Sequence, residues 1–269
     1  MSERMSSLST MGVIVAAAAA LGLRLYSILN GGSVIINVAF YALLLMAVGI
    51  ASLDGICRNS FASAFVFKNR FHLDVFSVVT AVGFLVEFIS LCHVIYQSLQ
   101  SGLWHRATVF VPQCMIALFA LLSALYFCCA AMSYHSERYD FRSLKLWHLV
   151  PLLWAVSRML TLMTSADELR SNPNIVLKYA ALASALGFLY MMARETVREQ
   201  GASRVTMVLA AVMPLLGEVY FFDSLMLLFA GKAALNAPDT VLAATLLLIS
   251  TFPFFFEKNI IDHTNTETS

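Results

Sequence analysis

The sequence predicts an all-α integral membrane protein, a polytopic transmembrane helix bundle with eight spans. Of its residues 60% are hydrophobic and only 12% are charged, whereas about a quarter of the residues in soluble domains are charged. The mean hydropathy of +0.79 leaves too little polar surface to cover a water-soluble globule. The apolar residues form long continuous stretches and do not alternate with polar ones, which excludes a transmembrane β-barrel.

Eight apolar stretches have the length of a membrane-spanning helix, about 17 to 27 residues each. The stretches are Met11–Leu29, Val34–Ala51, Leu73–Tyr96, Ala107–Met132, Leu146–Thr164, Ile175–Met192, Val205–Gly231 and Thr240–Phe256. Each is expected to be a helix, because a helix satisfies its own backbone hydrogen bonds in lipid. The connections are short, so residues 1–269 are expected to form a single integral membrane domain.

Basic residues distinguish the two sides of the membrane. The second, fourth and sixth connections and the two termini carry eleven Lys and Arg residues, and the other connections carry three. Cytoplasmic connections are enriched in Lys and Arg. The bias therefore predicts that both termini are cytoplasmic, which requires an even number of spans.

The two halves of the chain, residues 1–137 and 138–269, share features that favour a 4+4 parallel internal repeat. Arg24 in RLYSIL matches Arg158 in RMLTLM, and Glu87 in FLVEF matches Glu218 in LLGEV, with offsets of 134 and 131 residues. In such repeats the binding site usually lies between the halves, near the midplane. The alternative is chance similarity between apolar helices.

Charged residues inside the spans gather in the half of the bilayer farther from the termini. They are Arg24, Glu87, Arg158, Lys178, Glu218 and Asp223. Three cations balance three anions, and an arginine can reach a carboxylate one turn deeper on a neighbouring helix. Arg24 is therefore expected to pair with Glu87, and Arg158 with Glu218. For Arg24 and Lys178 the alternative is that the long side chain extends to the headgroups.

Glu218, near the middle of Val205–Gly231, is the residue on which the functional prediction depends. A short carboxylate at this depth must be paired, protonated or hydrated, because an isolated charge in lipid is costly. Pro214 frees a backbone carbonyl, and Gly217 lets a neighbour or ligand approach. We expect a polar outer-half cavity whose substrate- or ion-binding residues are Glu218, Glu87, Arg158, Arg24 and Asp223.

Several classes of function lack support in the sequence. It contains no GxGxxG, GxxxxGK[ST], HExxH or GxSxG motif, so no nucleotide-binding loop or hydrolase signature is present. The net charge of +1 gives no field that would attract nucleic acid. Four of the five cysteines lie inside apolar stretches, where a thiol packs as a small hydrophobic group. We expect no enzymatic activity, cofactor, metal site or nucleic-acid partner.

The segment PLLWAVSRML, Pro151–Leu160, and the helices that follow it resemble a group of uncharacterised multi-spanning membrane proteins of Gram-positive bacteria. That group has no known function to carry over. The resemblance implies a location in the bacterial cell (inner) membrane.

Together these features favour a small-solute transporter or a solute-binding membrane component. Its partners would be the lipid bilayer and a small solute or proton, with Glu218 as the proton-carrying group. The alternative is a non-catalytic membrane subunit or sensor, bound to a membrane protein partner, whose ion pairs only fix the helix register. A lipid-modifying enzyme is a third class, but it would need polar residues clustered at one membrane interface.

Overall fold

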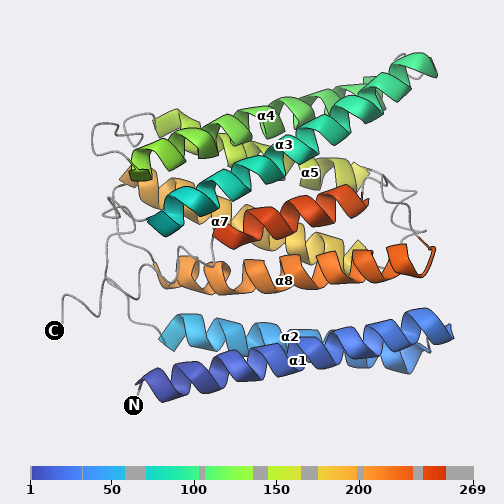
Figure 1. Ribbon diagram of the computed structural model, residues 1–269, viewed down its shortest axis with the longest axis vertical. Helices are drawn as coiled ribbons and strands as arrows, with labels where there is room; N and C mark the ends of the chain where they lie inside the picture. Colours follow the sequence, from blue (N-terminus) through green and yellow to red (C-terminus); the bar gives the residue numbers. More distant parts are fainter. Residues whose placement is uncertain are drawn as a thin grey trace.

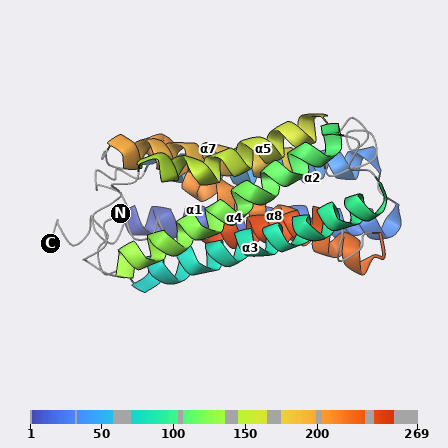
Figure 2. The same ribbon diagram turned by 90° about the horizontal axis from the view of Figure 1, so that it is seen from above.

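The computed structural model is a bundle of long helices that lie side by side (Figure 1). It describes residues 2–31, 33–57, 71–102, 107–135, 145–164, 175–198, 203–232 and 239–252. No strand occurs in these ranges. The helix axes keep a common direction when the molecule is turned (Figure 2), as expected for helices that cross one membrane.

Seven helices in the described ranges are long and apolar enough to cross a membrane. Six are α1 (Ser2–Asn30), α2 (Val34–Cys57), α3 (Phe71–Gln100), α4 (Ala107–His135), α7 (Ile175–Arg198) and α8 (Arg204–Phe229). The seventh joins a short 3-10 helix, η3 (Lys145–Leu149), to α5 (Val150–Thr164). The prediction of a multi-pass helical membrane protein is confirmed, and the first seven predicted spans each lie on one of these helices.

The eighth predicted span, Thr240–Phe256, overlaps a shorter apolar helix, Asp239–Phe252. Residues 253–256 lie outside the described residues. A helix needs about 20 residues to cross the hydrocarbon core. Eight spans therefore remain a prediction.

Three helices end in a glycine at the same end of the bundle, here called the distal end. At this end α1, α3 and α8 terminate, and Gly31, Gly102 and Gly231 follow them with φ of 78°, 73° and 67°. After α8 the amide of Gly231 donates to the Leu228 carbonyl at 3.0 Å, and the amide of Lys232 donates to the Leu227 carbonyl at 2.9 Å. This is the Schellman pattern, which requires a residue that accepts positive φ.

Aromatic side chains join four helices into one core. Trp154 of α5 packs edge to face on Phe84 of α3, with ring centroids 4.9 Å apart. Phe84 stacks on Phe127 of α4 at 5.7 Å, and Phe127 contacts Phe252 at 5.4 Å. All four side chains are buried. Such pairs contribute about 0.5–1.5 kcal/mol each beyond the area they bury.

Two glycines bring the helix Asp239–Phe252 close to its neighbours. A Cβ atom built on Gly83 of α3 would lie 2.9 Å from Cβ of Leu248, and one on Gly217 of α8 would lie 3.3 Å from Cβ of Ser250. Small residues at these contacts let helix backbones approach closely in a membrane. The helix Asp239–Phe252 is thus packed between α3 and α8.

The hairpin of α1 and α2 lies at one edge of the molecule and packs on the rest mainly through α8 (Figure 1). In a 4+4 repeat, α2 and α3 would correspond to α7 and α8. α7 packs extensively against α8, but α2 and α3 share no comparable contact among the described residues. These contacts do not support the internal repeat, which stays a prediction.

Candidate functional site

Three ion pairs between distant segments form the polar interior of the described bundle. The pairs are Arg24 with Asp223, Arg158 with Glu87, and Lys178 with Asp239. The Glu87 and Asp223 side chains are 0% exposed. Five of the six charged residues predicted inside the spans therefore take part in ion pairs, and two of the three pairs are buried.

The predicted partners are wrong for both arginines. Nε of Arg24 lies 2.7 Å from Oδ1 of Asp223, because α1 packs against α8. Nη2 of Arg158 donates to Oε1 of Glu87. Glu87 is therefore bound by α5 and not by α1.

Glu218 lies outside this polar interior. Its side chain is exposed on α8, whereas the adjacent Gly217 and Val219 are buried. It forms no hydrogen bond or ion pair with any residue that the structure describes. The expectation that Glu218 lines a cavity with the other charges is therefore wrong for this arrangement of helices.

The pair between α1 and α8 is enclosed by further contacts. Nη1 of Arg24 donates to Oδ1 of Asn37 at 3.3 Å, and the Ser27 hydroxyl donates to the same oxygen at 3.1 Å. The Arg24 guanidinium also lies 5.8 Å from the centre of the Phe40 ring. A cation near an aromatic face is stabilised by the ring. This cluster fastens the α1–α2 hairpin to α8.

The other two pairs border a pocket near the distal end, between α5, α7 and the helix Asp239–Phe252. Its lining residues are Arg158, Thr161, Leu162, Lys178, Leu182, Asp239 and Leu242. The centres of water-sized molecules can occupy about 40 Å³ of it, whereas one water needs about 10–15 Å³ by this measure. The pocket therefore has room for a few waters or for one small polar group. All its lining residues belong to the second half of the chain, so it does not lie between the predicted repeats.

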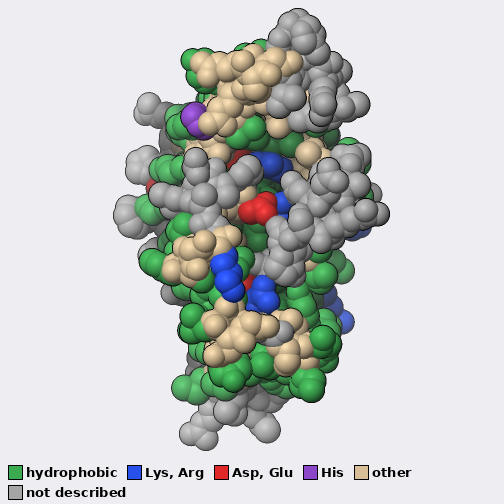
Figure 3. All heavy atoms as spheres, turned by 90° about the vertical axis from the view of Figure 1, so that its right-hand side faces the viewer, with side chains coloured by type: hydrophobic (Ala, Val, Ile, Leu, Met, Phe, Trp, Pro, Cys, Tyr) green, Lys and Arg blue, Asp and Glu red, His purple; other side chains and the backbone are tan. Residues whose placement is uncertain are grey.

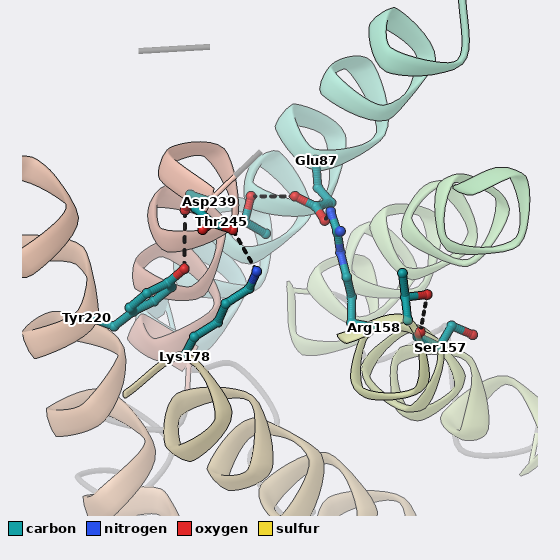
Figure 4. A network of polar contacts seen from close by, with 8 residues as sticks. Glu87, Ser157, Arg158, Lys178, Tyr220, Asp239 and Thr245 are labelled. Atoms are coloured by element: carbon teal, nitrogen blue, oxygen red, sulfur yellow. Dashed lines mark hydrogen bonds and ion pairs between the residues drawn. The ribbon is translucent and has the colours of Figure 1, made fainter. Parts of the chain in front are cut away.

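Arg158 keeps hydrogen-bonding capacity at this pocket. Glu87 has two partners, since Oε1 accepts from Arg158 and Oε2 accepts from the Thr245 hydroxyl at 3.3 Å. Nε of Arg158 is buried and has no partner. A buried donor without an acceptor costs about 1–3 kcal/mol. In Figure 4, Arg158 and Lys178 extend from neighbouring helices toward Glu87 and Asp239.

Asp239 is the more exposed residue of the Lys178–Asp239 ion pair. Nζ of Lys178 lies 2.6 Å from Oδ1 of Asp239, and the two side chains are 7% and 36% exposed. The Tyr220 hydroxyl donates to the Asp239 backbone carbonyl at 3.4 Å. Figure 3 shows basic and acidic side chains in a depression on the distal end. A polar path thus leads from the distal surface toward the pocket.

Sequence reasoning missed Asp239 and Thr161. Asp239 immediately precedes the apolar stretch that begins at Thr240, so its charge was assigned to a connection. A signal was present in Lys178, which enters its span from the same side and needs an anion at similar depth. Thr161 is a single hydroxyl in an apolar span, and nothing in its sequence context marks it.

Comparison of the chain with family models, with curated proteins and with solved structures finds no match. The resemblance of Pro151–Leu160 to membrane proteins of Gram-positive bacteria therefore stays a prediction. The geometry of the pocket must carry any functional conclusion.

Proposed function

We propose that this multi-pass membrane protein binds a small solute with an anionic group in the distal pocket, as a transporter or as a solute-binding component. The observation that carries the proposal is the pair of cationic side chains, Arg158 and Lys178, that line one pocket from two neighbouring helices. We further propose eight spans in a bacterial cell membrane with both termini cytoplasmic. The distal end then faces the exterior, from which the solute enters.

The charges around the pocket support an anionic ligand. Arg158 and Lys178 both line it, and Asp239 is the acid in its lining. Glu87 binds Arg158 from outside the lining. A guanidinium presents several donors in one plane, which suits the paired oxygens of a carboxylate or phosphate. The small volume limits the bound part to a few atoms, so the remainder of a larger solute would extend toward the distal opening.

The charge preference of the pocket tests this proposal. In a cysteine-free background, Thr161→Cys would be treated with two methanethiosulfonates, one bearing a sulfonate and one a trimethylammonium group. Ser101→Cys, an exposed residue just after α3, provides the reference rates. For each reagent, the rate at Thr161→Cys is divided by the rate at Ser101→Cys. We expect this ratio to be about tenfold higher for the sulfonate than for the trimethylammonium reagent, since nearby cations concentrate anions in a confined site.

Arg158→Gln should remove most of this preference, and Arg158→Lys should retain part of it. Equal relative rates for both reagents, or a preference for the cation, would contradict an anionic ligand. In proteoliposomes, access to Thr161→Cys from both sides would indicate a transporter. Access from the distal side alone would indicate a binding component.

A specific observation also favours the second candidate, a non-catalytic membrane subunit or sensor. The Arg24–Asp223 pair is buried and Arg24 is also bound by Asn37, which suits a pair that only sets helix register. The exposed Glu218 suits a protein that contacts another membrane protein. Neither candidate is an enzyme, and neither requires a metal or cofactor.

A further inference from the structure

One face of α8 carries a carboxylate, Glu218, followed along the helix by two exposed aromatic side chains. Glu218 is exposed, and Phe222 and Phe229 are 45% and 82% exposed. These positions are separated by four and seven residues, so they lie on one side of the helix. The opposite side of α8 is packed, since Asp223 binds Arg24 and Gly217 contacts the helix Asp239–Phe252. The exposed face is therefore a defined surface, here called the Glu218 face.

An ionised carboxylate on this face cannot simply contact lipid. The bilayer core offers no hydrogen-bond donor, so the charge needs a cation, water or a proton. α8 crosses the membrane, and Glu218 lies well inside it, between Arg204 and Phe229. Among the described residues Glu218 thus has no ion-pair partner, whereas Asp223 on the same helix binds Arg24.

The described part of the chain offers no unengaged cation at the depth of Glu218. Within the described spans, Arg24, Arg158 and Lys178 each bind a carboxylate. The exposed cations Arg194 and Arg204 lie toward the end of the bundle opposite the distal end, so a second copy packed in parallel would not bring them to the depth of Glu218. A cation at that depth would therefore come from another protein.

We propose that the Glu218 face docks a transmembrane helix of another protein that carries Arg or Lys at the same depth. The cation binds Glu218, and apolar side chains of the partner cover Phe222 and Phe229. A polar interhelical contact of this kind selects one partner and one register in the membrane. This inference does not depend on the pocket, which lies among other helices.

Synthetic transmembrane peptides can serve as the probe. The full-length protein, cysteine-free except for a donor fluorophore on Ser101→Cys, an exposed position outside the Glu218 face, is reconstituted in liposomes with acceptor-labelled Leu/Ala helices. One peptide has Arg at its centre, and matched peptides have Leu or Glu there. We expect the Arg peptide to bind at least about fivefold more tightly than the Leu peptide, as interhelical polar contacts in membranes allow. The Glu peptide should bind no better than the Leu peptide.

Variants at position 218 make the test specific. Glu218→Asp should keep the preference for the Arg peptide, and Glu218→Gln should abolish it. Since Glu218 is exposed and unpaired, both variants should fold, which thermal melting would verify. Equal binding of the Arg and Leu peptides would overturn the proposal, as would a preference that persists in Glu218→Gln. Glu218-dependent energy transfer between two protein copies without peptide would also overturn it, in favour of self-association.

Discussion

The two buried arginine–carboxylate pairs use the same chemistry in different surroundings. Arg24 binds Asp223 and is also contacted by Asn37 and Phe40. Arg158 binds Glu87, but its Nε has no partner and its side chain lines the pocket. Oδ2 of Asp223 is also buried without a partner among the described residues, so the two pairs differ in whether the arginine lines the described pocket and not in how fully they are hydrogen-bonded.

The location of each pair fits this division. Arg24 and Asp223 hold the α1–α2 hairpin, which packs on the other helices mainly through α8. Arg158 and Glu87 lie on helices that the Trp154–Phe84 contact already holds together. We therefore expect the Arg24–Asp223 pair to contribute more to the stability of its helix contact, and we propose that the Arg158–Glu87 pair leaves its arginine available to a ligand.

The largest expected effect on stability comes from breaking the Arg24–Asp223 pair. Asp223→Ala leaves Arg24 buried without a counter-ion and should lower the free energy of unfolding by about 3–5 kcal/mol. Unfolding in mixed detergent micelles would measure it. Glu218→Ala is the matched control, five residues earlier on the same helix but exposed, and should change stability by less than about 0.5 kcal/mol. Similar losses in both variants would contradict a structural role for Asp223.

The next largest effect tests whether the helix Asp239–Phe252, which lines the pocket, packs closely against α3. Gly83→Ala places a methyl group 2.9 Å from Cβ of Leu248 and should cost about 1–3 kcal/mol, because one of the helices must shift. Gly22→Ala, whose new methyl would have no atom within 4 Å, should leave stability nearly unchanged. If Gly83→Ala melts like Gly22→Ala, the helix Asp239–Phe252 does not pack against α3 as described.

Breaking the Arg158–Glu87 pair should lower the free energy of unfolding by less than breaking the Arg24–Asp223 pair. Arg158→Gln is expected to lower the free energy of unfolding by about 1–2 kcal/mol, because water in the pocket can hydrate Glu87. Arg24→Gln, the equivalent change in the enclosed cluster, should cost at least about twice as much. The same micelle titration applied to both variants decides this point, and equal losses would remove the contrast between the two arginines.

The smallest effect on stability is expected from breaking the Lys178–Asp239 pair. Asp239→Asn should change the free energy of unfolding by less than about 1 kcal/mol, since a partly exposed ion pair contributes little. It should nevertheless raise the reaction rate of the sulfonate reagent at Thr161→Cys about two- to threefold, because removing an acid makes the pocket more positive. Reaction kinetics would measure this change, and a lower rate would contradict the charge assignment.

The sequence predicted where the helices lie along the chain far better than which helices contact one another. Hydropathy sets where a span begins, so the start of α4 at Ala107 and of α7 at Ile175 agree with expectation. Both the core and the lipid-facing surface of a membrane bundle are apolar, so hydropathy does not reveal how a helix is rotated. Glu218 and Asp223 lie about 140° apart on α8, and only the packing of α1 on α8 determines that Asp223 faces inward.

The candidate site was predicted only in part, because the sequence does not show which helices are adjacent. Arg158 and Glu87 were identified because charges are rare in apolar spans. Their pairing depends on which helices are adjacent, and the pattern of residues along one helix does not contain that information. Asp239 was missed because it lies at the boundary between a connection and a helix.

Solvent access to the two clusters tests the central claim most directly. In lipid nanodiscs, a cysteine-free protein would carry Thr161→Cys beside Arg158 or Ser27→Cys beside Arg24, and a charged maleimide would be added. We predict that Thr161→Cys reacts readily and that Ser27→Cys, buried in the enclosed cluster, does not. If both positions stay unlabelled in folded protein, or if Ser27→Cys reacts as fast, the two pairs do not differ in the way described.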